Sequence, residues 1–166
     1  EAYNNLGITL QQLGKLEEAE ICCRKAITLK PDLAKAYLNM GVILKGKGDL
    51  GAAINSFIEA IKIKPNNTDA YANLAIALSG TVFIEPNPDI REIITSILDH
   101  KTYVRPRDIS TAAISLLKSE PVIKTVSNMH SAEELRLSLQ TAISGLSQIP
   151  LLLKFMSVCP IADLEL

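Results

Sequence analysis

The sequence predicts an all-α protein built from antiparallel helix hairpins that stack on one another. In the N-terminal half, a pattern of apolar and small residues recurs after 34 residues. Within each copy, the apolar residues follow the i, i+3, i+4, i+7 spacing of one helix face. In the C-terminal half, no useful length of sequence alternates with the period of two that a half-buried strand requires. We therefore expect helices and no sheet.

The repeat is visible at eight positions that recur in the same order in two successive copies, and a third copy begins after the second. The positions are Tyr3, Leu6, Gly7, Leu10, Gly14, Ala19, Ala26 and Pro31, then Tyr37, Met40, Gly41, Leu44, Gly48, Ala53, Ala60 and Pro65, then Tyr71, Leu74, Ala75 and Leu78. Matches of this number and order indicate one structural unit that is repeated.

Each copy is expected to form two helices. Tyr3, Leu6 and Leu10 share the face of the first helix that we expect to pack in the hairpin core. Gly14 suits the left-handed conformation that closes such a helix. Small residues on both helices allow a close approach of the two axes. A lysine and a proline then end the second helix of each copy.

At these residues the sequence resembles the tetratricopeptide repeat family. The resemblance covers residues 1–80, although Tyr3, Tyr37 and Tyr71 stand where the family often has tryptophan. It implies a right-handed solenoid whose concave face is lined by the first helices. It also implies that this face holds an extended peptide or a partner helix.

The pattern divides the chain into a repeat region over residues 1–101 and a non-repeat helical cap or linker region over residues 102–166. The expected repeats occupy residues 1–33, 34–67 and, in a divergent third copy, 68–101. Because Glu1 falls at the edge of a helical pattern that needs an upstream neighbour, we also expect the sequence to be an internal piece of a longer protein.

The divergent copy needs a three-residue insertion to align its isoleucines with the small residues of the earlier second helices. We expect Asp89 to cap a helix over residues 90–101 and Asp108 to cap another that runs to Lys118. Further helical segments are expected at residues 121–129, 131–144 and 151–158.

The charge balance restricts the partners. Lys and Arg number 17 and Asp and Glu number 18, which gives a net charge of −1 over 166 residues. This balance argues against nucleic acid or an anionic membrane as the main partner, and no apolar run is long enough to span a bilayer. We expect a cytoplasmic protein with protein or peptide partners, and the sequence indicates no particular oligomeric state.

We expect no catalytic residue, no metal site and no cofactor in this sequence, whatever the parent protein does. Residues 46–51 spell GxGxxG, but they fall between two predicted helices rather than between a strand and a helix, so turn chemistry explains them. Cys22 and Cys23 lack ligand spacing, as do His100 and His130. The three cysteines do not form a disulfide framework.

An asparagine recurs at the same position of each first helix, as Asn5, Asn39 and Asn73. Stacked repeats would align these amides in a ladder on the inner face, where one amide both donates to and accepts from a peptide unit. The ladder resembles the one in the superhelix of O-linked N-acetylglucosamine transferases. The candidate peptide-binding residues are Asn5, Thr9, Gln12, Lys35, Asn39, Lys45 and Asn73.

Two other functions have some basis in the sequence. The carboxylate clamp of co-chaperones requires cations at the positions of Asp69 and Asn73, and of its residues the sequence retains Asn39 alone. The second alternative is a substrate-presenting arm of a larger transferase, a methyltransferase or a glycosyltransferase. It rests on residues 151–166, which resemble the lead-in of bacterial methyltransferases that carry tetratricopeptide repeats.

Overall fold

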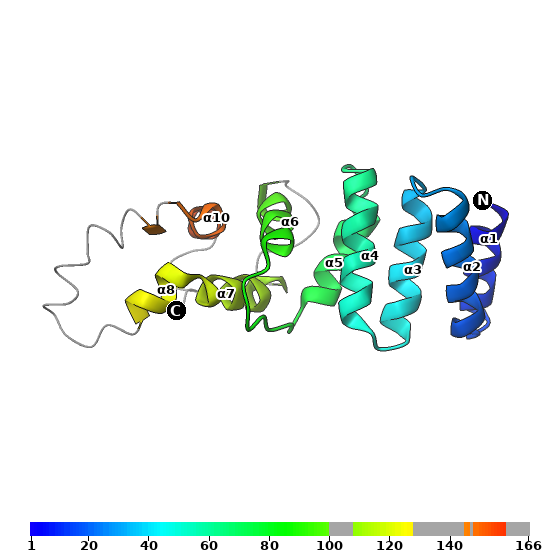
Figure 1. Ribbon diagram of the computed structural model, residues 1–166, viewed down its shortest axis with the longest axis horizontal. Coiled ribbons are helices and arrows are strands. Elements are labelled where there is room, and N and C mark those ends of the chain that lie inside the picture. Colours follow the sequence, from blue (N-terminus) through cyan, green and yellow to red (C-terminus); the bar gives the residue numbers. More distant parts are fainter. Residues whose placement is uncertain (100–107, 128–144, 147, 159–166) are drawn as a thin grey trace, which may run out of the picture. The chain divides into compact units, whose positions relative to one another are not determined.

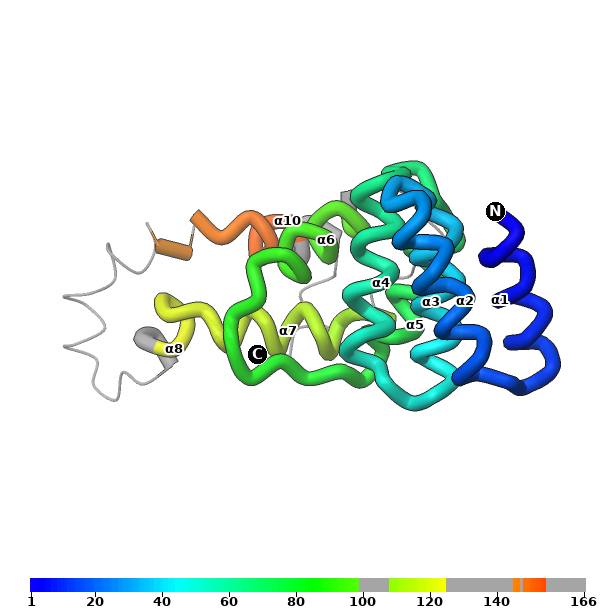
Figure 2. Tube along the Cα trace, turned by 45° about the vertical axis from the view of Figure 1, so that its right-hand side comes forward, coloured from blue at the N-terminus to red at the C-terminus, as the bar shows by residue number. Residues whose placement is uncertain are grey.

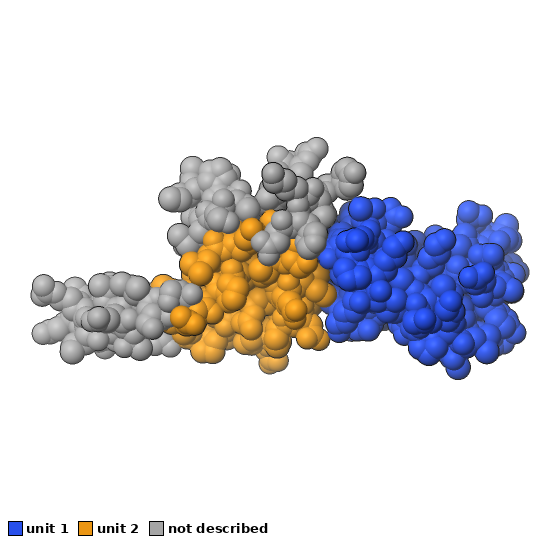
Figure 3. Space-filling view, turned by 90° about the horizontal axis from the view of Figure 1, so that it is seen from above, with its two compact units in different colours: residues 1–78 blue, residues 79–166 orange. Residues whose placement is uncertain are grey.

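The computed structural model describes residues 1–99, 108–127, 145–146 and 148–158. Every regular element in this part of the chain is a helix, as the sequence predicted. The chain divides into two compact units, Glu1–Leu78 and Ser79–Leu166 (Figure 3). The predicted helix over residues 131–144 and the end of the methyltransferase-like stretch, residues 159–166, lie outside the described residues.

The first unit consists of five helices that pack in chain order, each against the next (Figure 1). The first helices of successive hairpins also contact one another, α1 with α3 and α3 with α5. Figure 2 traces the backbone through these five helices, from α1 to α5. The five helices are α1 (Ala2–Gln12), α2 (Leu16–Leu29), α3 (Ala34–Gly46), α4 (Leu50–Ile63) and α5 (Thr68–Leu78).

The turns within the repeats use the residues that the sequence indicated. Gly14, Gly48 and Gly80 have φ angles of +74°, +87° and +79°, a region that glycine occupies without steric cost. Asp49 then caps α4, because its side-chain oxygen accepts the Ala52 backbone N–H at 3.0 Å. The GxGxxG segment is therefore a turn between two helices.

Glycine on the first helix sets the distance to the second helix. A Cβ atom on Gly41 would lie 2.4 Å from Phe57 Cε1, and one on Gly7 would lie 2.8 Å from Cys23 Sγ. Both neighbours are fully buried. The hairpin core therefore has room for the Phe57 and Cys23 side chains because the glycine that faces each of them has no side chain.

The expectation that Tyr3 and Leu6 pack in the core is wrong. Their exposed fractions are 41% and 48%, whereas Met40 and Tyr71, at the same positions in later repeats, are 6% and 4% exposed. The reason is that α2 covers α3 and α4 covers α5, whereas no described helix covers the corresponding side of α1. Tyr3 instead has the Lys25 ammonium 5.6 Å from its ring centre.

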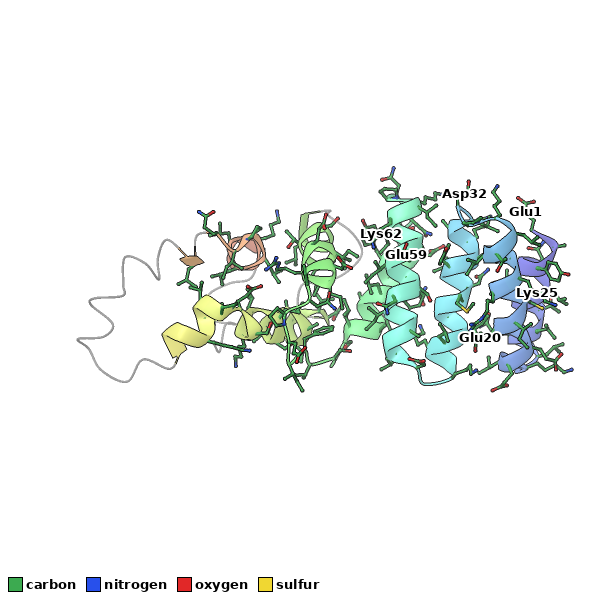
Figure 4. All side chains as sticks on the ribbon, viewed as in Figure 1. Glu1, Glu20, Lys25, Asp32, Glu59 and Lys62 are labelled. Carbon is green, nitrogen blue, oxygen red and sulfur yellow. The ribbon has the colours of Figure 1, made fainter. Side chains whose placement is uncertain are left out.

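An ion cluster of Glu17, Glu20, Arg24 and Lys47 joins α2 to the residue that follows α3. Glu20, which is labelled on α2 in Figure 4, accepts from the Lys47 Nζ at 2.7 Å and from the Arg24 guanidinium. Its side chain is 17% exposed. The hydrogen bond from Lys47 lowers the pKa of Glu20 below its ordinary value of 4.5, against the opposing effect of burial, and Arg24 adds to the lowering. The same hydrogen bond raises the pKa of Lys47.

The second unit has its own helix packing, in which α6 contacts α10 and α7, and α7 contacts α8 and α10. Its core includes Ile90, Ile94 and Ile97 of α6. The described helices are α6 (Pro88–Asp99), α7 (Ser110–Ser119), α8 (Pro121–Ser127) and α10 (Pro150–Val158). That α6 closes a third repeat remains a prediction, because its contacts with α7 and α10 lie within the second unit.

Two predicted helix caps are wrong. Asn87, not Asp89, caps α6, because its side-chain oxygen accepts the Ile90 backbone N–H at 3.1 Å and Pro88 then occupies the first helical position. Helix α7 begins at Ser110 rather than after Asp108, and its N-cap residue, Ile109, has no side-chain cap. Helix α6 therefore begins two residues before the start that the sequence predicted, and α7 begins one residue after its predicted start.

No described helix combines the length and the apolar character that crossing a bilayer demands.

Replacing Gly41 by alanine is expected to lower the free energy of unfolding by about 2 kcal/mol, because the new methyl group overlaps the Phe57 ring. The matched control is Gly51→Ala in α4, where a Cβ atom has no neighbour closer than 3.9 Å. This control is expected to raise stability by about 0.5–1 kcal/mol through helix propensity. Urea denaturation followed by circular dichroism measures both changes, and equal effects would contradict the packing argument.

The ion cluster predicts a pH dependence of stability. Because the pKa of Glu20 is lowered in the folded state, the stabilisation is present at neutral pH and is lost as the pH falls through 4.5 and below. Glu20→Gln is therefore expected to be less stable than the parent near neutral pH, with the difference vanishing in acid.

Urea denaturation at a series of pH values measures this dependence. Glu18→Gln is the control, because it alters an exposed ion pair, with Lys15 at 3.3 Å, within one helix. A constant difference between the parent and Glu20→Gln at all pH values would refute the assignment.

Candidate functional site

Three positions recur on the side of each first helix that faces away from the hairpin core, and together they form what we call the first-helix face. Within each helix they follow one another at i, i+4 and i+7, so they share one side of the helix. All nine side chains are exposed or half-buried. In the order of this spacing, the charged row is Glu1, Lys35 and Asp69, the amide row is Asn5, Asn39 and Asn73, and the aliphatic row is Ile8, Val42 and Ile76.

The amide row lies along the line where neighbouring first helices meet. The Asn39 Nδ2 donates to Asn4 Oδ1 at 2.8 Å, which links α3 to α1. The Lys45 Nζ donates to Asn73 Oδ1 at 2.9 Å, which links α3 to α5. These two hydrogen bonds fix the orientation of two of the three amides.

The amides keep part of their hydrogen-bonding capacity. Asn73 uses its oxygen once and also donates one Nδ2–H to the Asp69 carbonyl oxygen at 2.9 Å. Asn39 uses one N–H, and its oxygen accepts no hydrogen bond from any described residue. The Asn5 amide makes no hydrogen bond within the part of the chain that the structure describes. Since an amide offers two donors and two acceptor sites, each of the three retains at least one of each kind.

The other predicted site residues lie in different surroundings. Lys35 is exposed in the first turn of α3, and Lys45 is half-buried against Asn73. Gln12 is exposed at the end of α1, where the later repeats have Gly46 and Gly80. A side chain at this position is therefore present in the first repeat alone.

Thr9 occupies a position that the later repeats bury. Its hydroxyl donates to the Asn5 carbonyl oxygen at 3.1 Å, and it is exposed. Its counterparts Ile43 and Ala77 are 0% and 2% exposed, because that position faces the preceding repeat. That Thr9 lines a peptide-binding groove stays a prediction, and its position has no exposed counterpart in the later repeats.

The sequence reasoning missed two features of the face. The first is Asn4, which is 5% exposed and bonds Asn39; its counterparts are Leu38 and Ala72, so no periodic signal marks it. The second is the aliphatic row, whose members Ile8, Val42 and Ile76 recur with the same 34-residue period as the asparagines. This recurrence is the sequence signal from which the aliphatic row could have been predicted.

The described residues offer little support for a reactive cysteine or a metal centre. Burial, with a smaller contribution from Cys22, raises the pKa of the Cys23 thiol to about 11, so this sulfur is not a thiolate at neutral pH. Among the residues that the structure describes, no three His, Cys, Asp or Glu side chains gather to hold a metal ion. His100 and His130 lie outside those residues.

The second unit contains an open hollow of about 450 Å³. Its lining includes Arg91, which already pairs with Glu120. The residues that line it are Pro88, Arg91, Glu92, Thr95, Ser96 and Pro150.

Comparison with known proteins agrees with the architecture of the first unit. A family model described as tetratricopeptide repeat matches residues 1–33, and a second, described as TPR repeat, matches residues 43–81. No curated relative matches the chain. The first matched span contains α1, α2 and Asn5, and the second contains α4, α5 and Asn73. Most of α3, with Asn39, lies between the two spans.

These matches and the stacked helix hairpins establish the repeat type and, with it, a protein–protein interaction module in general. Over residues 1–33 and 43–81, this chain is therefore similar to the tetratricopeptide repeat family.

Proposed function

We propose that the first-helix face holds an extended polypeptide segment and that this chain acts as a binding module without catalysis of its own. The observation that carries the proposal is the placement of the amide row. Three amides occupy the same position on three successive first helices, and two of them are tied to a neighbouring first helix by hydrogen bonds of 2.8 and 2.9 Å.

The amide row suits recognition of a main chain. An asparagine side chain can donate to a peptide carbonyl and accept from a peptide N–H, and it does so whatever side chain the partner carries. The contacts of Asn39 and Asn73 with their neighbours reduce the rotamer freedom that binding would otherwise remove. A partner segment in an extended conformation suits this pairing, because the peptide groups of a helix or a sheet are already hydrogen-bonded to one another.

The energy available from the amides is modest. A net hydrogen bond contributes about 1 kcal/mol, so three contribute about 3 kcal/mol, which falls short of millimolar affinity. Additional contacts beside the amide row are therefore required for useful binding. Three neighbouring first helices, with axes about 10 Å apart, span about six residues of an extended chain.

Asn39→Ala and Asn73→Ala are each expected to weaken the binding of an extended peptide about fivefold, because each removes one hydrogen-bonding amide. The probe is a fluorescently labelled, uncharged peptide of about ten residues that lacks proline, and fluorescence anisotropy reports its affinity. Asn55→Ala is the matched control, since Asn55 is an exposed asparagine on the second helix α4.

The three variants are compared only after circular dichroism has verified that they retain the helical content of the parent. Unchanged affinity in both Asn39→Ala and Asn73→Ala, or an equal loss in Asn55→Ala, would show that the peptide binds elsewhere.

A further inference from the structure

The aliphatic row of the first-helix face is only partly covered by the packing of the repeats. Ile76 is 62% exposed, although its neighbours Ala77 and Leu78 are almost fully buried in the same helix. Ile8 and Val42 occupy the same position in the earlier repeats and are half-buried. A β-branched aliphatic side chain therefore stands at this surface position in every copy, where a solvated face would carry polar residues.

The aliphatic row runs beside the amide row. Within each first helix, the aliphatic residue follows the asparagine by three positions, which places the two side chains on adjacent turns of one helix side. A chain that lies along the amides therefore has the aliphatic row next to it over all three repeats. In an extended chain, successive side chains point to opposite sides, so every second one faces this row.

The charges on the face favour neither a positively nor a negatively charged partner. The charged row alternates in sign along the repeats, from Glu1 through Lys35 to Asp69, and all three are exposed. When Lys45, which contacts Asn73, is counted with this row, the face has as many positive as negative side chains. A peptide of one charge sign would meet repulsion at one repeat for each attraction at another.

Resting on the proposed function, we infer that the partner is an extended, uncharged segment with aliphatic side chains at alternate positions. Its main chain lies along the amide row, and its aliphatic side chains pack on Ile8, Val42 and Ile76. Removal of this apolar surface from water supplies the affinity that three hydrogen bonds lack.

The test uses four labelled peptides of about ten residues that differ at alternate positions, which carry Val, Ser, Asp or Lys, with Ser at the remaining positions. The Val peptide is expected to bind at least about tenfold more tightly than the Ser peptide, because several methyl groups leave water. The Asp and Lys peptides are expected to bind no more tightly than the Ser peptide.

A matched pair of variants locates the effect on the chain. Ile76→Thr keeps a β-branched shape but adds a hydroxyl, and it is expected to weaken the Val peptide about threefold to tenfold and to leave the Ser peptide unchanged. Ile21→Thr is the control, since Ile21 is 55% exposed on α2, outside the first-helix face. It is expected to change neither affinity.

The outcomes separate this inference from the proposed function. If Asn73→Ala weakens both the Val and the Ser peptide but Ile76→Thr weakens neither, the main-chain groove stands and the aliphatic preference is refuted. Tighter binding of the Asp or Lys peptide also refutes it. If no peptide binds, or if Asn39→Ala and Asn73→Ala change nothing, the proposed function fails and this inference fails with it.

Discussion

The close approach of the two helices in each hairpin is the constraint on which the first unit depends. Gly41 lies against the Phe57 ring and Gly7 against the Cys23 sulfur, and a single methyl group on either glycine would overlap its neighbour. This approach brings Ala19 and Cys23 into the cluster that also contains Met40 and Ile43 of the next hairpin. One contact distance within a hairpin therefore sets how the following hairpin stacks.

The fold of the first unit could be predicted from the sequence because its determinants are local and periodic. Apolar spacing indicated the helices, and the positive-φ glycines Gly14 and Gly48 marked their ends. The exposure of Tyr3 and Leu6 could not be predicted in this way, since these positions are buried in later repeats by the second helix of the preceding repeat. The start of α6 was missed because Asp89 and Asn87 are both acceptable capping residues, and Pro88 decides between them.

The candidate site was predictable to the extent that it is periodic. The asparagines recur in register, and so does the aliphatic row that sequence reasoning passed over. Asn4 was not predictable, because its partner, Asn39, lies 35 residues away and its own position is not repeated as an amide. The burial of Ile43 and Ala77, the counterparts of Thr9, was not predictable either, because 100° per residue describes one helix and contains no information on which side the neighbouring repeat lies.

The hydrogen bond between Lys45 and Asn73 makes two neighbouring members of the amide row, Asn39 and Asn73, chemically unequal. At Asn73 the side-chain oxygen is already shared with an ammonium group, which itself has further N–H groups to offer, so the surroundings of this amide are rich in donors. At Asn39 the oxygen remains open and one N–H is committed to Asn4, so this amide is better suited to accept than to donate. Two side chains of the same residue type thus have opposite hydrogen-bonding preferences, and the difference comes from the one neighbour that each of them contacts.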